Sequence, residues 1–408
     1  MAVTNEAVTF PAPRDKACPF DPAAVPTGAE GAPGRVRIWD GSEAWIVSRY
    51  ADARAVLGDE RFSADPNQPG FPEKSAAYKA AMAERNVRTL DNPDHDVEKR
   101  MLIRDFTVRR VAQLRPKIQD RVDSLIAAML ESGPPADIVT DLAFSVPTMV
   151  ICEMLGVPYE DRDFFARRAN LCLNSAVSED VAGQAGRELE AYLDELIDQK
   201  DRQPEDDLIS RLVVDVMRSG ERSREHVIAQ AKLVLVTGHE TTANMIALSI
   251  LALLVHPDQL DLLTTSEDPK LLGNAVEELL RYINVAHTGR RRVALEDIDV
   301  NGTLIHAGEG VIVANNVADR DESMFQDAGR LDIQRENARS TLAFGYGIHQ
   351  CMGQLLSRVE LEVVLGTLWK RIPTLRLAKS FEEIPFKEDG SVYGLHSLPV
   401  EWGTVIPA

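Results

Sequence analysis

A cysteine stands among glycines in the ten-residue stretch FGYGIHQCMG, Phe344 to Gly353, and an amphipathic helical pattern follows at once. Free N–H groups at the start of a helix stabilise an anion, which favours a thiolate at Cys351 as a soft metal ligand. The glycines allow a flat group to lie against the backbone. The stretch therefore predicts a haem iron held by one thiolate, and the alternative is an inert buried cysteine beside a glycine-rich turn.

A second group of polar residues lies in the longest helical pattern, from Ser223 to His256, with Ser223 as N-cap and Pro257 as stop. At 1.5 Å per residue this helix would span roughly 50 Å, so it must run through the core. Its centre reads VTGHETTAN, Val236 to Asn244, where apolar residues are expected. Buried polar side chains in a central helix need hydrogen-bond partners or a chemical role.

Composition and charge exclude several classes of protein. The 408 residues carry a net charge of -19, which argues against binding nucleic acid or an anionic membrane through the whole surface. The four cysteines are far apart, so neither a disulfide framework nor a zinc site is expected. The N-terminus lacks a basic segment followed by an apolar run, and the apolar stretch 229–255 contains charged residues. We therefore expect a cytoplasmic protein with a buried core helix.

The remaining pattern predicts a mainly α protein with small β-sheets. Residues 1–35 are rich in Pro, Ala and Gly and indicate an extended N-terminal arm, and 36–408 are expected to form a single domain. Two hairpins are expected, around Asp40-Gly41 and Asn301-Gly302. Between them the pattern from Asp52 to Tyr282 is mostly helical.

The cysteine stretch resembles the haem-binding signature of the cytochrome P450 family, in the residues Phe344, Gly345, Gly347, His349, Cys351 and Gly353. The resemblance implies a single-domain cytochrome P450 fold with a long central helix. It also implies haem b, iron protoporphyrin IX, with Cys351 as the metal ligand and Phe344, Gly345, His349 and Gly353 around the cofactor. Other family signatures follow in the expected order along the chain.

Two further motifs take their meaning from this resemblance. The segment AVEELLRY carries Glu278 and Arg281, which are similar to the family's Glu-x-x-Arg pair and would form a buried structural network. TGHETT, Thr237 to Thr242, resembles the oxygen-binding groove, with Glu240 and Thr241 as catalytic acid and alcohol. The alternative for Thr241 is a hydrogen bond back to a carbonyl of the preceding turn. Thr237 stands where the family usually has Ala or Gly.

Basic residues resemble the family's haem-propionate contacts. In DNPDHDVEKRMLIRDF His95 matches, and Lys99 or the adjacent Arg100 would supply the next cation. Arg292 and His349 would complete the set. The alternative for each basic residue is a solvated surface charge. By resemblance, the substrate pocket would be lined by Val87, Leu173, Val236, Thr237, Val285, His287, Tyr393 and Leu395.

The resemblance implies a soluble bacterial haem-thiolate monooxygenase of the actinomycete secondary-metabolite and xenobiotic type. It would hydroxylate a lipophilic organic substrate with dioxygen and two electrons from a ferredoxin and its reductase. One rival is the family's nitric oxide reductase branch, which takes electrons directly from NAD(P)H and shares features similar to DGS-AW and GFPE. The other is a non-catalytic haem sensor. The intact Glu240–Thr241 pair favours oxygen activation.

The acidic chain raises a question about its electron donor, because a ferredoxin is also acidic. By resemblance, basic residues on the proximal side of the haem would form a docking face: Lys99, Arg100, Arg104, Arg109, Arg110 and Arg358. The alternative is a solvated helix face or a set of propionate contacts.

Overall fold

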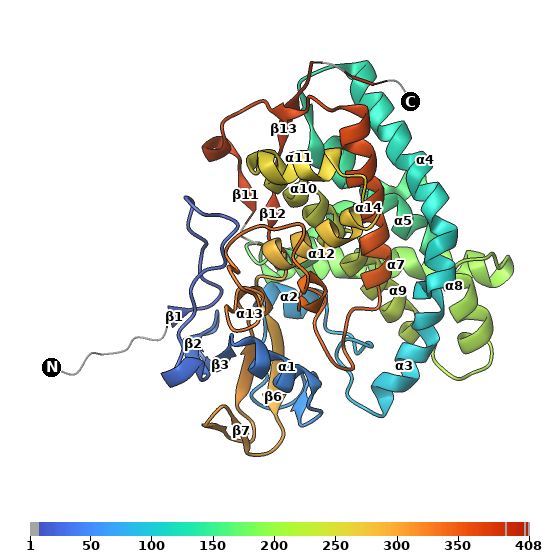
Figure 1. Ribbon diagram of the computed structural model, residues 1–408. Coiled ribbons are helices and arrows are strands. Elements are labelled where there is room, and N and C mark those ends of the chain that lie inside the picture. Colours follow the sequence, from blue (N-terminus) through green and yellow to red (C-terminus); the bar gives the residue numbers. More distant parts are fainter. Residues whose placement is uncertain (1–7, 388–389, 404, 407–408) are drawn as a thin grey trace.

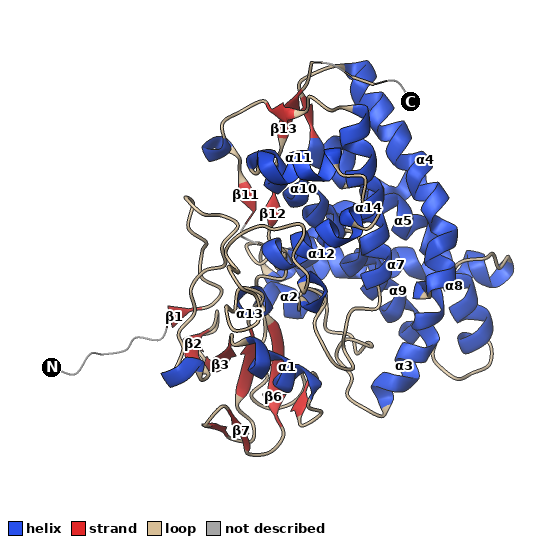
Figure 2. Ribbon diagram, viewed as in Figure 1, coloured by secondary structure: helices blue, strands red, loops and turns tan. Residues whose placement is uncertain are grey.

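A computed structural model describes residues 8–387, 390–403 and 405–406. Helices make up most of the molecule, and the largest sheet lies to one side of them, at the lower left of Figure 1. Figure 2 shows the same separation by colour, with a smaller group of strands at the opposite end. This arrangement confirms the mainly α fold with small sheets.

The helices follow one another along most of the chain. They are α1 (Tyr50–Gly58), α2 (Ala76–Ala81), α3 (Asp94–Leu102), α4 (Val108–Ser132), α5 (Ser145–Leu155), α6 (Arg162–Leu173), α7 (Glu179–Arg202), α8 (Leu208–Arg211), α9 (Arg224–Gly238), α10 (Glu240–Val255), α11 (Pro257–Thr265), α12 (Leu271–Ile283), α13 (Asn315–Ala318) and α14 (Gln354–Arg371).

The strands form one sheet of six strands and three small ones. The large sheet has the order β1 (Val8–Thr9), β2 (Gly34–Arg37), β3 (Glu43–Val47), β9 (Gly310–Val313), β6 (Arg290–Ala294) and β4 (Phe62–Ser63). The small sheets contain β7 (Ile298–Val300) with β8 (Thr303–Ile305), β11 (Phe386–Lys387) with β12 (Gly394–Leu395), and β10 (Arg376–Leu377), β13 (Pro399–Glu401) and β5 (Ala136–Asp137).

Both predicted hairpins are present. β2 and β3 pair antiparallel around Asp40-Gly41, and β7 and β8 pair around Asn301-Gly302, where both residues have positive φ. Val8–Thr9 of the predicted arm adds a parallel strand beside β2. The division into an arm at 1–35 and one domain at 36–408 stays a prediction.

The predicted central helix is present, although its hydrogen-bond ladder is broken at one residue. Together α9 and α10 form an apolar helical stretch, Arg224–Val255, long enough to span a membrane, but 78% of its most apolar window is buried inside the protein. The expectation of a core helix is therefore confirmed. The expectation of an uninterrupted helix is wrong at His239, which separates α9 from α10.

A buried ion network ties α12 to the loop that precedes the cysteine stretch. Glu278 and Arg281 are both fully buried, and the guanidinium donates to both carboxylate oxygens at 2.7 and 2.8 Å. Arg335, which the sequence did not single out, donates to the same two oxygens at 3.1 Å. Arg281 also donates to the carbonyls of Asp319 and Ala328 at 2.8 and 2.9 Å. The pair is therefore a structural junction.

The side chain of Asp319 extends this junction toward Cys351. Its carboxylate accepts hydrogen bonds from Asn284 Nδ2, Thr341 Oγ1 and the backbone N–H of Leu342, at 2.7, 2.9 and 2.7 Å. Leu342 in turn accepts a hydrogen bond from the N–H of Gly345 at 2.8 Å. Helix α12 and the start of the cysteine loop, Phe344 to Gly353, are thus joined by a continuous set of hydrogen bonds.

Glu360 on α14 is a buried acid, and its Oε2 has no hydrogen-bond partner among the described residues. Burial alone raises the pKa of this carboxyl to about 8. The unfolded chain ionises Glu360 near its ordinary pKa, so between that value and about pH 8 the folded state binds more protons. Stability must therefore fall as the pH rises through this range.

We predict that Glu360→Gln removes this pH dependence. Between pH 5 and pH 8 the wild type should lose on the order of 3 kcal/mol of unfolding free energy more than the variant does. Urea unfolding followed by circular dichroism at each pH measures the difference. Glu362→Gln, an exposed change on the same helix, is the control and should keep the wild-type slope. Equal slopes in Glu360→Gln and wild type would contradict the prediction.

Candidate functional site

The cysteine loop bends through two residues in left-handed conformation. Gly345 and Gly347 both have φ of 75°, and a side chain at Gly347 would collide with the carbonyl of Leu57. The N–H of Cys351 donates to the carbonyl of Phe344 at 3.0 Å, which closes the loop. Gly353 is the N-cap residue of α14, so the thiol sits just before the helix N-terminus, as predicted.

Burial governs the thiol more strongly than the helix start does. It raises the pKa of Cys351 above its usual range, while the Arg290 guanidinium, the N–H groups of Gly353 and Gln354, and Arg358 act in the opposite direction. The sequence argument considered only the helix effect, and the net direction differs because desolvation is larger. A cation at the sulfur is what favours the thiolate in such a site.

The residues around this thiol fit a haem. A side chain at Gly345 would meet only Arg290 Nε within 4 Å, at 3.7 Å, so little protein covers this part of the loop. Among the described residues, buried His349 Nδ1 has no hydrogen-bond partner, and neither does Nδ1 of His95, whose ring lies 4.5 Å away. Asp96 approaches His95 Nδ1 to 3.5 Å without hydrogen-bond geometry. Two unpaired imidazole nitrogens beside a glycine loop suit the acidic edge of the cofactor.

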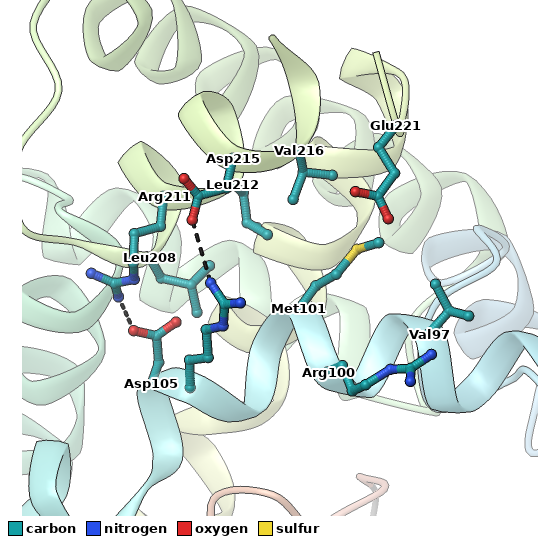
Figure 3. Close-up of a pocket in the computed structure, with 11 residues that line it drawn as sticks. Val97, Arg100, Met101, Asp105, Leu208, Arg211, Leu212, Asp215, Val216 and Glu221 are labelled. Carbon is teal, nitrogen blue, oxygen red and sulfur yellow. Dashed lines mark ion pairs between the residues drawn. The ribbon is translucent and has the colours of Figure 1, made fainter. Parts of the chain in front are cut away.

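The structure separates the two cations that the sequence left as alternatives. Lys99 lies one helical turn after His95 and donates from Nζ to the carbonyl of Ile348 at 2.5 Å, within the cysteine loop. Arg100 lies on another face of α3, where it lines a surface groove of about 300 Å³ (Figure 3). The geometry therefore favours Lys99 and leaves Arg100 outside the cofactor site.

Arg292 extends from β6 toward the same edge. It is buried, and its guanidinium donates to the carbonyl of Arg291 at 2.8 Å. Burial and the neighbouring Arg290 lower the pKa of Arg292 to about 10, so it stays charged near neutral pH. Lys99, His95, His349 and Arg292 thus come together from three separate parts of the chain, as the sequence predicted.

The break in the central helix lies at the predicted oxygen groove. His239 Nδ1 lies 3.0 Å from the carbonyl of Leu235, and Thr241 Oγ1 donates to the carbonyl of Thr237 at 3.2 Å. Side chains therefore bond to carbonyls one turn earlier, which is the alternative considered for Thr241. A side chain at Gly238 would collide with Ile151, so close packing against α5 explains this glycine.

Glu240 is the first residue of α10, and its side chain is buried rather than exposed to solvent. It is 1% exposed, and its Oε1 contacts Lys387 Nζ of β11 and accepts a hydrogen bond from Asn170 Nδ2 at 3.1 Å. Its Oε2 has no hydrogen-bond partner within the described part of the chain. Sequence reasoning missed Lys387 and Asn170, because they lie far from Glu240 in the sequence and belong to no motif.

The proposed substrate-pocket residues divide into two groups. Around the turn 390–395, Ser391 N donates to Leu173 O at 2.8 Å, Tyr393 N donates to Val285 O at 2.9 Å, and His287 Nε2 lies 2.7 Å from Gly390 O. The turn therefore brings these residues together. The Tyr393 hydroxyl, however, donates to Pro19 O at 2.7 Å, which gives that side chain a packing role against the N-terminal segment.

The other four residues are Val236 and Thr237 in α9, Leu395 in β12, and Val87 in the segment between α2 and α3. Val236 is fully buried, and Val87 and Leu395 belong to the same apolar core. Thr237 is partly exposed, and its hydroxyl donates to the carbonyl of Leu233 at 2.8 Å. Thr237 is therefore the member of this group with the most accessible surface.

Comparison with known proteins identifies the family. A family model described as cytochrome P450 matches residues 178–372. Cytochrome P450 GfsF from Streptomyces halstedii is 46% identical, covering 98% of this chain and 97% of its own length. The chain belongs to the cytochrome P450 family. It is a haem-dependent monooxygenase whose cofactor is an iron protoporphyrin IX.

Two solved P450 structures are similar over nearly the whole chain. The crystal structure of GfsF has a TM-score of 0.89 and 45% identity, covering 97% of this chain and 100% of that one. Mycinamicin VIII C21 methyl hydroxylase from Micromonospora griseorubida, solved with mycinamicin VIII, has a TM-score of 0.88 and 39% identity with the same coverage. The P450 fold with its long central helix is thereby confirmed.

We predict that Lys387 positions Glu240 for proton transfer in this P450. Lys387→Met leaves a buried carboxylate without its cation, so product formation should slow by about tenfold or more, with a larger solvent isotope effect and more peroxide per electron. Stopped-flow kinetics in H2O and D2O measure the rate and the isotope effect, and a peroxide assay measures the peroxide formed per electron. Lys387→Arg should restore much of the rate, and the exposed Lys379→Met should match wild type. Unchanged coupling in Lys387→Met would show that the contact has no such role.

Proposed function

We propose that this P450 hydroxylates a lipophilic organic substrate, with Cys351 as the thiolate ligand and a ferredoxin system as electron donor. The observation that carries the proposal is the half-buried Cys351 just before α14, beside two imidazoles with no hydrogen-bond partner at Nδ1 among the described residues, the half-buried Lys99 and the buried Arg292. When bound, the haem supplies the activation of dioxygen and the oxidising power for insertion of one oxygen atom into a C–H bond.

The chain's own residues would hold and surround the cofactor. Lys99 and Arg292 provide positive charge for the propionates, and His95 and His349 offer hydrogen-bonding nitrogens at the same edge. Phe344, Gly345 and Gly353 belong to the loop against which the macrocycle would lie, and the Arg358 guanidinium lies 4.6 Å from the centre of the Phe344 ring. These residues would hold the cofactor in one orientation.

Glu240 and Thr241 would transfer protons during oxygen activation. Lys387 and Asn170 hold one oxygen of Glu240, and the second oxygen is left for a water or for proton exchange. Thr241 can rotate its hydroxyl away from the carbonyl of Thr237 and donate into the groove instead. The pair thus provides an acid with a fixed position and an alcohol with a movable hydrogen.

Relatives show how varied the substrates of similar proteins are. These proteins include pentalenic acid synthase of Streptomyces avermitilis and vitamin D3 dihydroxylase of Streptomyces griseolus, 44% and 42% identical to this chain. These support hydroxylation of a lipophilic molecule by a cytoplasmic enzyme. Neither nitric oxide reduction nor haem sensing is favoured by these relatives.

The first prediction of this proposal concerns the ligand. The reduced carbon monoxide complex of the wild type should show the red-shifted absorbance band of thiolate-ligated haem, because a thiolate donates more electron density than an imidazole does. Cys351→His should abolish the band, and Cys18→Ser, at an exposed cysteine, should retain it. A wild-type spectrum typical of histidine ligation would refute the assignment.

The electron donor would dock where basic residues remain unpaired. Several of the expected docking cations are matched by acids of this chain: Arg104 by Asp215 at 3.5 Å, Arg110 by Asp206 at 2.9 Å, and Arg358 by Glu277 at 2.9 Å. Figure 3 shows the acids Asp105, Asp215 and Glu221 lining the same surface groove as Arg100. The docking face is therefore of mixed charge, which the sequence prediction did not include.

Arg100 and Arg109 are the exposed cations of this set that form no ion pair within the described ranges. We predict that Arg100→Glu with Arg109→Glu slows reduction by an acidic ferredoxin and flattens its salt dependence, because steering by exposed charges is screened over about 10 Å at 0.1 M salt. Stopped-flow reduction measures this effect, and peroxide-driven turnover should not change.

The control for this pair is Arg376→Glu in the small sheet at the opposite end of the molecule, where β13 is labelled in Figure 1. It makes the same kind of charge change far from α3 and should leave reduction unaffected. Equal ferredoxin kinetics in the double variant and the wild type would place the docking site elsewhere.

A further inference from the structure

A cavity of about 200 Å³ adjoins the proposed propionate edge, and its wall is strongly cationic. It lies between the loop that follows β4, strand β6 and the cysteine loop. Glu73 is the acidic residue among the described side chains that line it. Five of the basic lining residues are Lys74, Arg88, Arg290, Arg291 and Arg292.

These five cations have no matching anion among the described residues. Within residues 8–387, 390–403 and 405–406 none of them forms an ion pair, and Nε of both Arg88 and Arg291 is buried without a hydrogen-bond partner. Arg291 is 6% exposed. Lys74 and Arg88 both lie over the Tyr78 ring, at 4.6 and 5.3 Å from its centre. Arg291 and Arg292 are buried, and Lys74, Arg88 and Arg290 are half-buried. Unpaired charge that is removed from water in this way is costly unless a ligand neutralises it.

The cations also repel one another. Burial is the main cause that lowers the pKa of Lys74, and the neighbouring Arg88, Arg291 and Arg290 lower it further. Burial likewise lowers the pKa of Arg291 to about 10, with Glu73 acting in the opposite direction. An oxyanion placed among them would relieve both the repulsion and the lost hydration.

The cofactor does not account for this charge. A haem has two propionates, and both could be neutralised by members of this set rather than by Lys99. Glu73 pairs at 3.9 Å with Lys79, a further basic residue of the wall. At least two of the five positive charges would therefore remain, even if Glu73 were counted against this set. Arg88 and Arg290 are the strongest candidates, because the Arg88 side chain makes no hydrogen bond with the described residues and Arg290 has one long contact, 3.5 Å, to Ala343 O.

We infer that Arg88 and Arg290 bind a carboxylate of the substrate, so that this enzyme acts on a lipophilic organic acid. This inference rests on the monooxygenase function proposed above. Guanidinium groups bind carboxylates in a paired, planar geometry. Arg290 lies against the cysteine loop, with one guanidinium nitrogen 3.5 Å from Ala343 O and Nε 3.7 Å from the position of a side chain at Gly345, which places the anion near Cys351. The acid group would therefore anchor one end of the substrate beside the haem.

The rest of the lining suits the apolar body of such a molecule. Leu57, Phe71 and Met82 line the same cavity as the cations. A substrate with one acidic end and an apolar remainder would satisfy both parts of the wall, whereas a neutral lipophilic molecule would leave the arginines unpaired. The site thus selects for charge as well as for shape.

Matched acids and amides test the inference. We would titrate the holoenzyme calorimetrically with phenylalkanoic acids of increasing chain length and with their primary amides. At least one acid should bind about tenfold or more tightly than its amide, as charge-assisted hydrogen bonds are stronger than neutral ones. Arg88→Gln and Arg290→Gln should each remove most of this preference while leaving amide binding and haem content unchanged.

Arg85→Gln is the matched control, because Arg85 is an exposed residue of the same loop that pairs with Asp65 at 3.8 Å. It should keep the wild-type preference for acids. The inference is overturned if no acid binds better than its amide, or if the preference survives both variants. It is also overturned if Arg290→Gln loses haem with an unchanged preference, which would assign Arg290 to a propionate.

Two further arms separate related explanations. Inorganic phosphate that binds alone as tightly as the acids would reveal a free-anion site and overturn the substrate assignment. Product analysis distinguishes failure of this inference from failure of the proposed function. Oxidised amides without any acid preference would leave the monooxygenase standing and reject the carboxylate site, whereas acid preference with no oxidised product would reject the monooxygenase role alone.

Discussion

The position of the cysteine loop depends on one buried ion network. Glu278 holds two guanidinium groups, Arg281 and Arg335, and all three are almost completely removed from water. Removing one partner of a buried pair typically costs about 3–5 kcal/mol, because the other is left uncompensated. From Arg281 the hydrogen bonds continue through Asp319 to Leu342, two residues before the cysteine stretch. The network therefore sets where the metal ligand can lie.

The site that this loop completes is built from polar groups that form no ion pair, or leave a nitrogen without a hydrogen bond, within the described part of the chain. Imidazoles at 95 and 349, the cations Lys99 and Arg292, and the cysteine itself converge from α3, β6 and the loop before α14. Burial disfavours a charged thiol, and it disfavours unpaired arginines for the same reason. The metal of an anionic cofactor would stabilise the thiolate, and the cofactor's acidic groups would pair with arginines. An anionic substrate would neutralise the positive charge that remains.

Local patterns in the sequence were sufficient for the mainly α class, the Asn301-Gly302 turn and the apolar central helix, which each follow from short-range rules. The P450 fold and the expected roles of the site residues came from the resemblance to the family. Partners distant in sequence could not be predicted: Arg335 on Glu278, Lys387 on Glu240, and the acids that pair with Arg104 and Arg110. The break at His239 arises where side chains form hydrogen bonds to backbone carbonyls one turn earlier. The periodicity of apolar residues does not predict such bonds. Which of Lys99 and Arg100 faces the cysteine loop depends on the orientation of α3, which the sequence alone does not give.

The central claim is that the Glu278 network holds the cysteine loop. Amide hydrogen exchange of a peptide spanning Thr341–Cys351 tests it most directly, with Glu278→Gln compared with Glu362→Gln, which disturbs only the exposed pair with Arg115 at 2.8 Å. The account predicts exchange at least about tenfold faster in Glu278→Gln, because local opening becomes easier by about 1.4 kcal/mol or more, and no change in Glu362→Gln or in the β7–β8 hairpin. Equal protection of the loop in Glu278→Gln and wild type would contradict it.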